Sequence, residues 1–372
     1  MKELILKTTL FCISIFFSFH LVEFGLKKFD ETKEFSKPQF DDTNIIQKKK
    51  AQGAVSVIPG TIYLNKKIPN LLPLGGISLK ETIFGNENDY LVTYNSDRYG
   101  FRNEDYIWEK PIDSILIGDS FGHGAHVKNE FSISGVLNKN SIVTLNLGYG
   151  GTGPLSQYAI LKEYFPSQKK IKNVIWCFYE GNDMFDLVNE LKDEVLVRYL
   201  EEQEFSQNLK EQQNIIDEMH YNTLKKNLES LKLEIPKKLS ERIKYLFSFK
   251  RIKNLTYVTY HSIFPAEKEF ERVLVLIKDF TTKNDAKLYF VYLPEFYRFT
   301  NLDKFYDLKY KSNYKKITNI AKKHDIKIID IANFFESEVI DPFSLFPYRS
   351  FGHYNEKGYQ LVGKEIIKKI AP

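Results

Sequence analysis

Asp113-Ser-Ile-Leu-Ile-Gly-Asp-Ser-Phe-Gly122 joins a short apolar run to an abrupt polar turn. The apolar run has the length of a buried strand, and glycines follow it, so the segment is typical of a strand that runs into a tight turn and a helix start. Such a turn places Ser120 at the carboxyl end of a strand, the edge at which open α/β sheets bind their ligands. An isolated Asp-Ser pair more commonly marks a serine that caps a helix, so the meaning of Ser120 depends on the rest of the chain.

Further apolar runs follow this stretch and alternate with helical patterns. Apolar strands between amphipathic helices predict an α/β fold in which helices cover both faces of a parallel sheet. We therefore expect about five parallel strands and a closing helix over 355–370. The predicted strands are residues 114–118, 142–147, 173–179, 287–293 and 327–331, and helical patterns between them include 154–165 and 270–281.

Residues 184–262 interrupt the alternation of strand and helix. This segment is charged, rich in Glu, Lys, Leu and Asn, and helical in its periodicity, with Pro236 as an internal break. It has no strand pattern, so it predicts a helical insertion between the third and fourth strands. The insertion would either cover the body of the protein or cap the carboxyl edge of the sheet, where it would select a substrate.

The composition is that of a globular protein, with 43% hydrophobic and 27% charged residues. A net charge of +5, from 53 basic and 48 acidic residues, is too small to indicate a nucleic-acid partner. Cys12 and Cys177 fall in different predicted elements, so no disulfide framework is expected, and no Cys/His spacing suggests structural zinc. We predict no cofactor.

In the first 28 residues, lysines at positions 2 and 7 precede a largely apolar run from Thr8 to Val22. Leu4 to Leu26 is just long enough for one membrane span, which needs about 20 apolar residues. A cleaved signal peptide is the alternative, but residues 19–24 are bulky and offer no small-residue cleavage site. We therefore expect a signal anchor or transmembrane helix.

The resulting domain organisation has three parts. Residues 1–28 form the anchor, residues 29–89 form a polar tether and an irregular N-terminal segment, and residues 90–372 form the main domain. Either interpretation of the N-terminus exports that domain, so we expect a membrane-anchored extracytoplasmic protein, periplasmic or on the cell surface, or a secreted one if the segment is cleaved.

Polar blocks follow the first three predicted strands and precede the last helix, which places them at one edge of the sheet. Together and in this order they resemble the SGNH (GDSL-type) hydrolase family, over roughly residues 90–370. The blocks are Gly118-Asp-Ser-Phe121, Asn146-Leu-Gly-Tyr-Gly-Gly-Thr152, Tyr179-Glu-Gly-Asn-Asp183 and Gly352-His-Tyr-Asn-Glu-Lys-Gly-Tyr359. The resemblance implies a three-layer α/β/α flavodoxin-like fold.

A narrower resemblance rests on the stretch Tyr94-Asn-Ser-Asp-Arg-Tyr-Gly-Phe-Arg102, the N-terminal anchor and the helical insertion. These features look like the extracytoplasmic SGNH proteins that accompany bacterial surface-polysaccharide synthesis. The resemblance implies a substrate that carries acyl groups on a cell-surface glycan.

Acyl transfer needs a nucleophile, a base that takes its proton, and donors for the developing oxyanion. The resemblance assigns the hydroxyl to Ser120 and the base to His353. For the oxyanion it implies the backbone N–H of Ser120, the N–H of Gly151 and the side-chain amide of Asn182. Gly151 is chosen over its neighbouring glycines by its spacing, five residues beyond Asn146. A lone histidine at position 353 would otherwise be a surface residue that caps the last helix.

The family pattern places an aspartate two or three residues before the histidine, where this chain has Ser350 and Phe351. Either a Ser-His dyad operates, with a backbone carbonyl orienting the ring, or a carboxylate comes from elsewhere, and Asp341 is the nearest candidate. Asp183 is interpreted as a structural partner.

His123 and His126 follow Ser120 closely in the sequence. His123 could contact a substrate or replace the base. With Asp119 nearby, the two histidines raise the question of metal binding. No further ligand cluster accompanies them, so no metal site is predicted.

The sequence thus predicts a serine-dependent hydrolase or acyltransferase acting on O-acyl, in particular O-acetyl, groups of a glycan. Water as second nucleophile would make it an O-acetylesterase, and a sugar hydroxyl an O-acetyltransferase, which would need an acyl-donating membrane protein. One alternative is a glycan-binding or scaffold protein with an SGNH fold whose activity has decayed, which the missing aspartate supports. The other is a general lipase or thioesterase with an apolar acyl channel.

Overall fold

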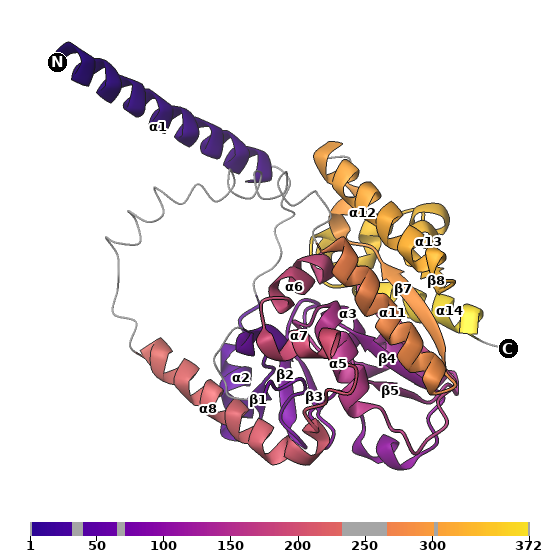
Figure 1. The fold of residues 1–372 in the computed structure, drawn as a ribbon. Helices are drawn as coiled ribbons and strands as arrows, with labels where there is room; N and C mark the ends of the chain where they lie inside the picture. Colours follow the sequence, from indigo (N-terminus) through magenta and orange to yellow (C-terminus); the bar gives the residue numbers. More distant parts are fainter. Residues whose placement is uncertain (1, 32–39, 65–70, 233–265, 301–303, 371–372) are drawn as a thin grey trace. The chain divides into compact units, whose positions relative to one another are not determined.

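A five-stranded parallel sheet lies at the centre of the fold in the computed structural model of the chain (Figure 1). Its strand order is β5-β4-β6-β7-β8, which is 2-1-3-4-5 in chain order, the flavodoxin-like arrangement. This confirms the predicted fold class. The strands are β4 (Ser114–Gly118), β5 (Thr144–Asn146), β6 (Asn173–Tyr179), β7 (Lys287–Leu293) and β8 (Lys327–Asp330).

The structure describes residues 2–31, 40–64, 71–232, 266–300 and 304–370. The chain divides into two units, one made of residues 1–38 and 225–263 and the other of residues 39–224 and 264–372. The second unit holds the sheet and the candidate site.

Alternate residues of the central strands point to opposite faces of the sheet, and each face has its own core. Ile115 and Ile117 of β4 pack into the core that includes α5 (Pro154–Tyr164) and α11 (Glu267–Lys283). Leu116, between them, packs into the core that includes α4 (Ile133–Lys139) and α14 (Glu356–Ile370). All five residues of β4 are buried, because helices cover both faces. The three layers follow from this alternation. Helix α12 (Lys304–Lys323) packs with the first core, and α13 (Ile331–Glu338) follows β8.

The described part of the predicted insertion is helical and lies between β6 and β7, as expected. It comprises α6 (Asp183–Glu190), α7 (Glu194–Glu201) and α8 (Gln213–Lys232), and residues 233–265, with Pro236, lie outside the described residues. The α8 side chains bind the segment before the main sheet: the Ser78 N–H donates to Asp217 over 2.9 Å, and the Tyr63 hydroxyl contacts His220 Nδ1 at 2.8 Å. These contacts fix α8 on the segment before the main sheet.

A small second sheet precedes the main one. It contains β1 (Val55–Ser56), β2 (Glu81–Gly85) and β3 (Val92–Asn95), with β1 parallel and β3 antiparallel to β2. Apolar residues of this region, such as Ile58 and Leu72, are buried in the same core as β4. The expected boundary between residues 89 and 90 thus falls inside the β2–β3 hairpin, and residues 40–64 and 71–89, with helix α2 (Thr43–Ala51), belong to the larger unit.

Helix α1 (Lys2–Glu31) spans the residues of the predicted anchor. Within the described parts of the chain, no helix combines the length and the apolar character that a membrane crossing requires.

Candidate active site

The turn after β4 presents Ser120 at the carboxyl edge of the sheet. Gly118 ends the strand against β6, where an added Cβ would lie 2.7 Å from the carbonyl oxygen of Cys177, so only glycine fits. Asp119 then caps the short helix α3 (Ser120–His123) by accepting a 2.8 Å hydrogen bond from the Phe121 N–H. Asp119 is fully buried, and this burial raises the pKa of its carboxyl group. The Ser120 side chain itself is only partly buried and can meet a ligand.

His353 contacts the Ser120 hydroxyl directly. Its Nε2 lies 2.9 Å from Ser120 Oγ, although the two residues are 233 positions apart in the chain. His353 stands in the loop before α14, and its ring packs on Phe121, the neighbour of Ser120, with the ring centroids 4.9 Å apart. A neutral imidazole at this distance can accept the hydroxyl proton, which is what activates a serine nucleophile.

Glu87 supplies a carboxylate on the other side of the His353 ring. His353 Nδ1 lies 3.2 Å from both Glu87 carboxylate oxygens, and the His353 backbone N–H donates to Glu87 Oε2 over 3.0 Å. Burial opposes ionisation, but the hydrogen bonds and charge of His353, with the charge of His126, lower the pKa of Glu87 to about 2. An ionised carboxylate here fixes the Nδ1–H tautomer and stabilises the imidazolium.

The candidate acid from the sequence, Asp341, does not contact His353 but pairs with Arg349. The second bond of this pair, from Arg349 Nη2 to Asp341 Oδ1, is 3.1 Å long, and both side chains are exposed. The prediction of Asp341 was therefore wrong, because it assumed an acid close to His353 in sequence. Glu87 lies in the hairpin loop between β2 and β3, where the run Gly85-Asn-Glu-Asn-Asp89 predicts a turn but not the partner of that turn.

The glycine-rich loop after β5 packs against the Ser120 turn. The Tyr149 N–H donates to the Gly118 carbonyl over 2.9 Å, and a Cβ added to Gly150 would lie 3.7 Å from the Ser120 Cβ. The Gly150 N–H is not available to an oxyanion, because it donates to His123 Nδ1 over 3.2 Å. The N–H of Gly151 has no hydrogen-bond partner among the described residues, so it remains the candidate oxyanion donor of this loop.

Asn182 follows β6 at the start of α6. Its Nδ2 donates to Asp186 Oδ2 over 2.5 Å, which leaves a second N–H on the same nitrogen available to a ligand. Burial, together with the charges of Glu190 and Asp119, raises the pKa of Asp186 to about 7. Asp183 accepts a 2.9 Å hydrogen bond from the Tyr179 N–H, in line with its interpretation as a structural partner.

His123 is buried behind the glycine loop and does not take the place of the base. Its Nδ1 accepts from Gly150, and its Nε2 lies 3.1 Å from the Tyr94 hydroxyl. Burial lowers the pKa of His123 well below its usual value, which keeps the ring neutral. Both nitrogens are engaged, so His123 supports the loop.

His126 lies on the other side of the site, near Glu87 and His353. These three residues could each offer one metal-ligand atom, and the three atoms lie within 4.8 Å of one another. The sequence predicted no metal site, because it considered His126 with Asp119 and not with the distant Glu87.

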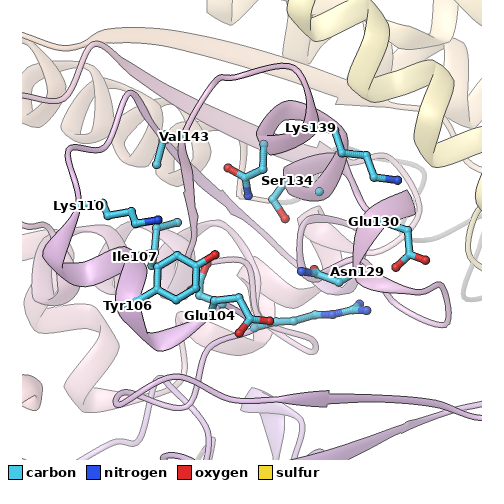
Figure 2. A pocket seen from close by; sticks show the side chains of 13 residues that line it. Glu104, Tyr106, Ile107, Lys110, Asn129, Glu130, Ser134, Lys139 and Val143 are labelled. Atoms are coloured by element: carbon cyan, nitrogen blue, oxygen red, sulfur yellow. The ribbon is translucent and has the colours of Figure 1, made fainter.

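A separate pocket of about 560 Å³ lies between the 3₁₀ helix Asp105–Glu109 and helix α4 (Figure 2). Tyr106 and Lys110 line it on one side, and Glu130 and Lys139 on the other. Neither Ser120 nor His353 is among its lining residues, so this pocket is not part of the constellation described above.

The fold and the site define a three-layer α/β protein with a Ser-His-carboxylate arrangement at the carboxyl edge of a parallel sheet. No protein-family model and no curated protein matches the chain. Similar solved structures include a member of the lipolytic protein G-D-S-L family from Veillonella parvula, with 11% identity over 70% of this chain and 98% of that one and a TM-score of 0.39. A lipase/acylhydrolase from Enterococcus faecalis is 13% identical over 70% and 95% of the two chains, with a TM-score of 0.36. An acetylxylan esterase from Geobacillus stearothermophilus is 13% identical over 70% and 94%, with a TM-score of 0.35.

Proposed function

We propose that this protein is a serine-dependent enzyme that cleaves or transfers acyl esters through an acyl-Ser120 intermediate. The observation that carries the proposal is the continuous contact from Ser120 Oγ to His353 Nε2 at 2.9 Å and from His353 Nδ1 to the Glu87 carboxylate at 3.2 Å. The base thereby reaches both the nucleophile and the orienting acid.

In the proposed reaction Ser120 Oγ attacks the ester carbonyl while His353 takes the hydroxyl proton. The carbonyl oxygen becomes an oxyanion, which the N–H groups of Ser120 and Gly151 and the second N–H of Asn182 would stabilise. His353 then returns its proton to the leaving alcohol as the C–O bond breaks. A second nucleophile, water or another hydroxyl, attacks the acyl-serine with His353 again as base and releases Ser120.

We further propose that the substrate is an O-acyl group, in particular O-acetyl, on a cell-surface glycan. Support for this finer part comes from the sequence resemblance, as does support for an acyl-donating membrane protein if the enzyme is a transferase. The extracytoplasmic location also stays a prediction from the first 28 residues. A general lipase or thioesterase would use the same three groups on a longer acyl chain.

The alternative of a decayed, purely binding protein has lost its main support. That alternative rested on the missing aspartate near His353, and Glu87 now provides a carboxylate in contact with the ring.

The test uses the full-length protein and its Ser120→Ala variant, each incubated with a serine-directed fluorophosphonate and with 4-nitrophenyl acetate. We expect labelling of Ser120 and turnover in the wild type alone. Equal signals from both proteins would overturn the proposal. Acetate, butyrate and octanoate esters then measure acyl preference, and an acetylated oligosaccharide with an unacetylated acceptor separates acetate release from transfer. A preference for octanoate would overturn the O-acetyl assignment.

A further inference from the structure

The loop that carries Glu87 brings a second histidine to the same carboxylate. His126 Nε2 lies 3.6 Å from Glu87 Oε1, on which His353 Nδ1 also lies at 3.2 Å. The two imidazole rings are 5.0 Å apart between centroids. A Ser-His-acid triad needs only one histidine, so the proposed reaction leaves His126 without a role.

The chain fixes His126 in this position by local means. His126 has a left-handed backbone with φ 58°, and its carbonyl accepts a 3.0 Å hydrogen bond from Asn88, the neighbour of Glu87. Gly85, on the same hairpin, has φ 129°, and a Cβ there would come within 2.9 Å of the His126 ring. The Phe84 ring packs edge-on against His126, with centroids 5.3 Å apart. The hairpin thus positions both the carboxylate and the second imidazole.

The three side chains are also accessible. His126 is 17% exposed and Glu87 and His353 are each 22% exposed, so solvent ions reach the group while the surrounding contacts hold it. Two imidazoles and one carboxylate are a common ligand set for zinc in proteins, with a fourth position left to water. The potential ligand atoms lie within 4.8 Å of one another, so small side-chain rotations would bring them onto one ion.

We propose that Glu87, His126 and His353 form a binding site for a divalent transition-metal ion, with Zn²⁺ as the preferred occupant, and that the bound ion reversibly blocks the Ser120–His353 pair. The ion binds the lone pair of His353 Nδ1, so the single proton of the neutral ring moves from Nδ1 to Nε2. An Nε2 that already carries a proton cannot accept the proton of Ser120 Oγ, which the base step requires. The blocking part rests on the proposed acyl-transfer function, whereas the binding part does not.

Metal binding is tested first, by titrating metal-free Ser120→Ala protein with Zn²⁺ in a calorimeter and with Co²⁺ by visible absorption. This variant keeps all three ligands and cannot turn over an ester. We expect one ion per chain with a tetrahedral Co²⁺ spectrum. His126→Asn, in the same background, is expected to weaken binding by about 100-fold, since loss of outer-shell partners alone costs about 10- to 100-fold. Asparagine tolerates the left-handed backbone at this position.

The matched control is His324→Asn, which removes the histidine of a pair outside the candidate site, between His324 after α12 and Glu271 of α11, with 2.6 Å between Nε2 and Oε1. We expect it to bind Zn²⁺ as the parent does. Glu87→Gln is a second ligand variant, so the result does not depend on how well His126→Asn folds. No saturable binding by the parent, or equal binding by parent, His126→Asn and Glu87→Gln, would overturn the site.

Inhibition is tested on the wild type with 4-nitrophenyl acetate. We expect Zn²⁺ to abolish turnover, EDTA to restore it, and His126→Asn to need about 100-fold more Zn²⁺ for the same fractional inhibition. Binding without inhibition, or activity that requires Zn²⁺, would overturn the blocking role. Specific binding in a protein that has no esterase activity even when metal-free would uphold the site and overturn the proposed function instead.

Discussion

The two halves of the candidate site come from different kinds of structure. Ser120 and Asn182 stand at the ends of adjacent parallel strands, β4 and β6, whose register is fixed by continuous pairing from Ser114–Asn173 to Gly118–Cys177. Glu87 stands in the loop of a small antiparallel hairpin that belongs to another sheet. The main sheet places its residues by the pairing of its strands, whereas the position of Glu87 depends on contacts between the hairpin loop and the main body, such as the hydrogen bond from Asn88 to the His126 carbonyl. Ser120 and Asn182 therefore follow from the common sheet topology, whereas Glu87 depends on a separate element of this chain.

The strongest test of the sheet-borne half is Ser120→Ala. Removal of the nucleophile should lower kcat for 4-nitrophenyl acetate by about 10⁴- to 10⁶-fold, since the triad acts as a unit. Ser337→Ala, at an exposed position of α13, is the control and should keep wild-type kcat. Substantial activity in Ser120→Ala would mean that the sheet edge does not carry the chemistry.

The hairpin-borne half is tested by Glu87→Gln, which keeps the shape of the side chain and removes its charge. Loss of the anion that orients the ring should lower kcat by about 10²- to 10⁴-fold, with little change in KM. Asp341→Asn, which breaks only the pair with Arg349, should stay within about 2-fold of the wild type. A large loss of kcat in Asp341→Asn, with little change in Glu87→Gln, would show that Asp341 is the acid partner of His353 and that Glu87 is not.

The sequence predicted the sheet-borne half because its signals are local. Both strands are buried along their whole length and largely apolar, and Ser120 and Asn182 come just after them, so their shared edge follows from the topology. The position of Glu87 depends on which surface the β2–β3 hairpin packs against. The loop is held by residues far away in sequence: Asn88 donates to the His126 carbonyl over 3.0 Å, and the Tyr90 hydroxyl donates to Glu356 over 2.7 Å. No spacing within the chain encodes it.

The sequence groups His126 with His123 and Asp119, whereas in the structure it lies beside Glu87 and His353. Its direction is set by a left-handed backbone at position 126 and by the room that Gly85 leaves on the hairpin. Neither feature has a pattern in the sequence near residue 126, and a non-glycine residue seldom adopts this conformation. The same reason explains why the cluster with Glu87 and His353 was missed.

A smaller effect is expected at the oxyanion candidate Asn182. Asn182→Ala removes the side-chain donor and should lower kcat by about 10²- to 10³-fold at nearly constant KM, because the donor acts on the charge that develops in the transition state. Asn189→Ala, in the same helix α6, is the matched control. An unchanged kcat in Asn182→Ala would leave the oxyanion to the backbone donors alone.

The smallest expected effect is on the free energy of unfolding, and it comes from Asp186, the hydrogen-bond partner of Asn182. The pKa of Asp186 is raised to about 7 in the folded protein, so the folded state holds a proton that the unfolded chain releases above about pH 4. Stability contributed at this site is therefore greatest below pH 4 and falls as the pH rises to 7. Asp186→Asn should add about 1 to 3 kcal/mol to the free energy of unfolding at pH 8 and little at pH 4.

Urea denaturation of wild type and Asp186→Asn at pH 4 and pH 8 measures this difference. A variant that is equally destabilised at both pH values would show that Asp186 is held as an anion by contacts that asparagine cannot make.

The contact between Glu87 and His353 joins positions 266 residues apart, one early in the chain and one near its end. In the proposed mechanism, a ribosome that has produced Ser120, the glycine loop and Asn182 has still not produced the imidazole that would activate the serine. We therefore expect a nascent chain that ends before His353 to have no esterase activity.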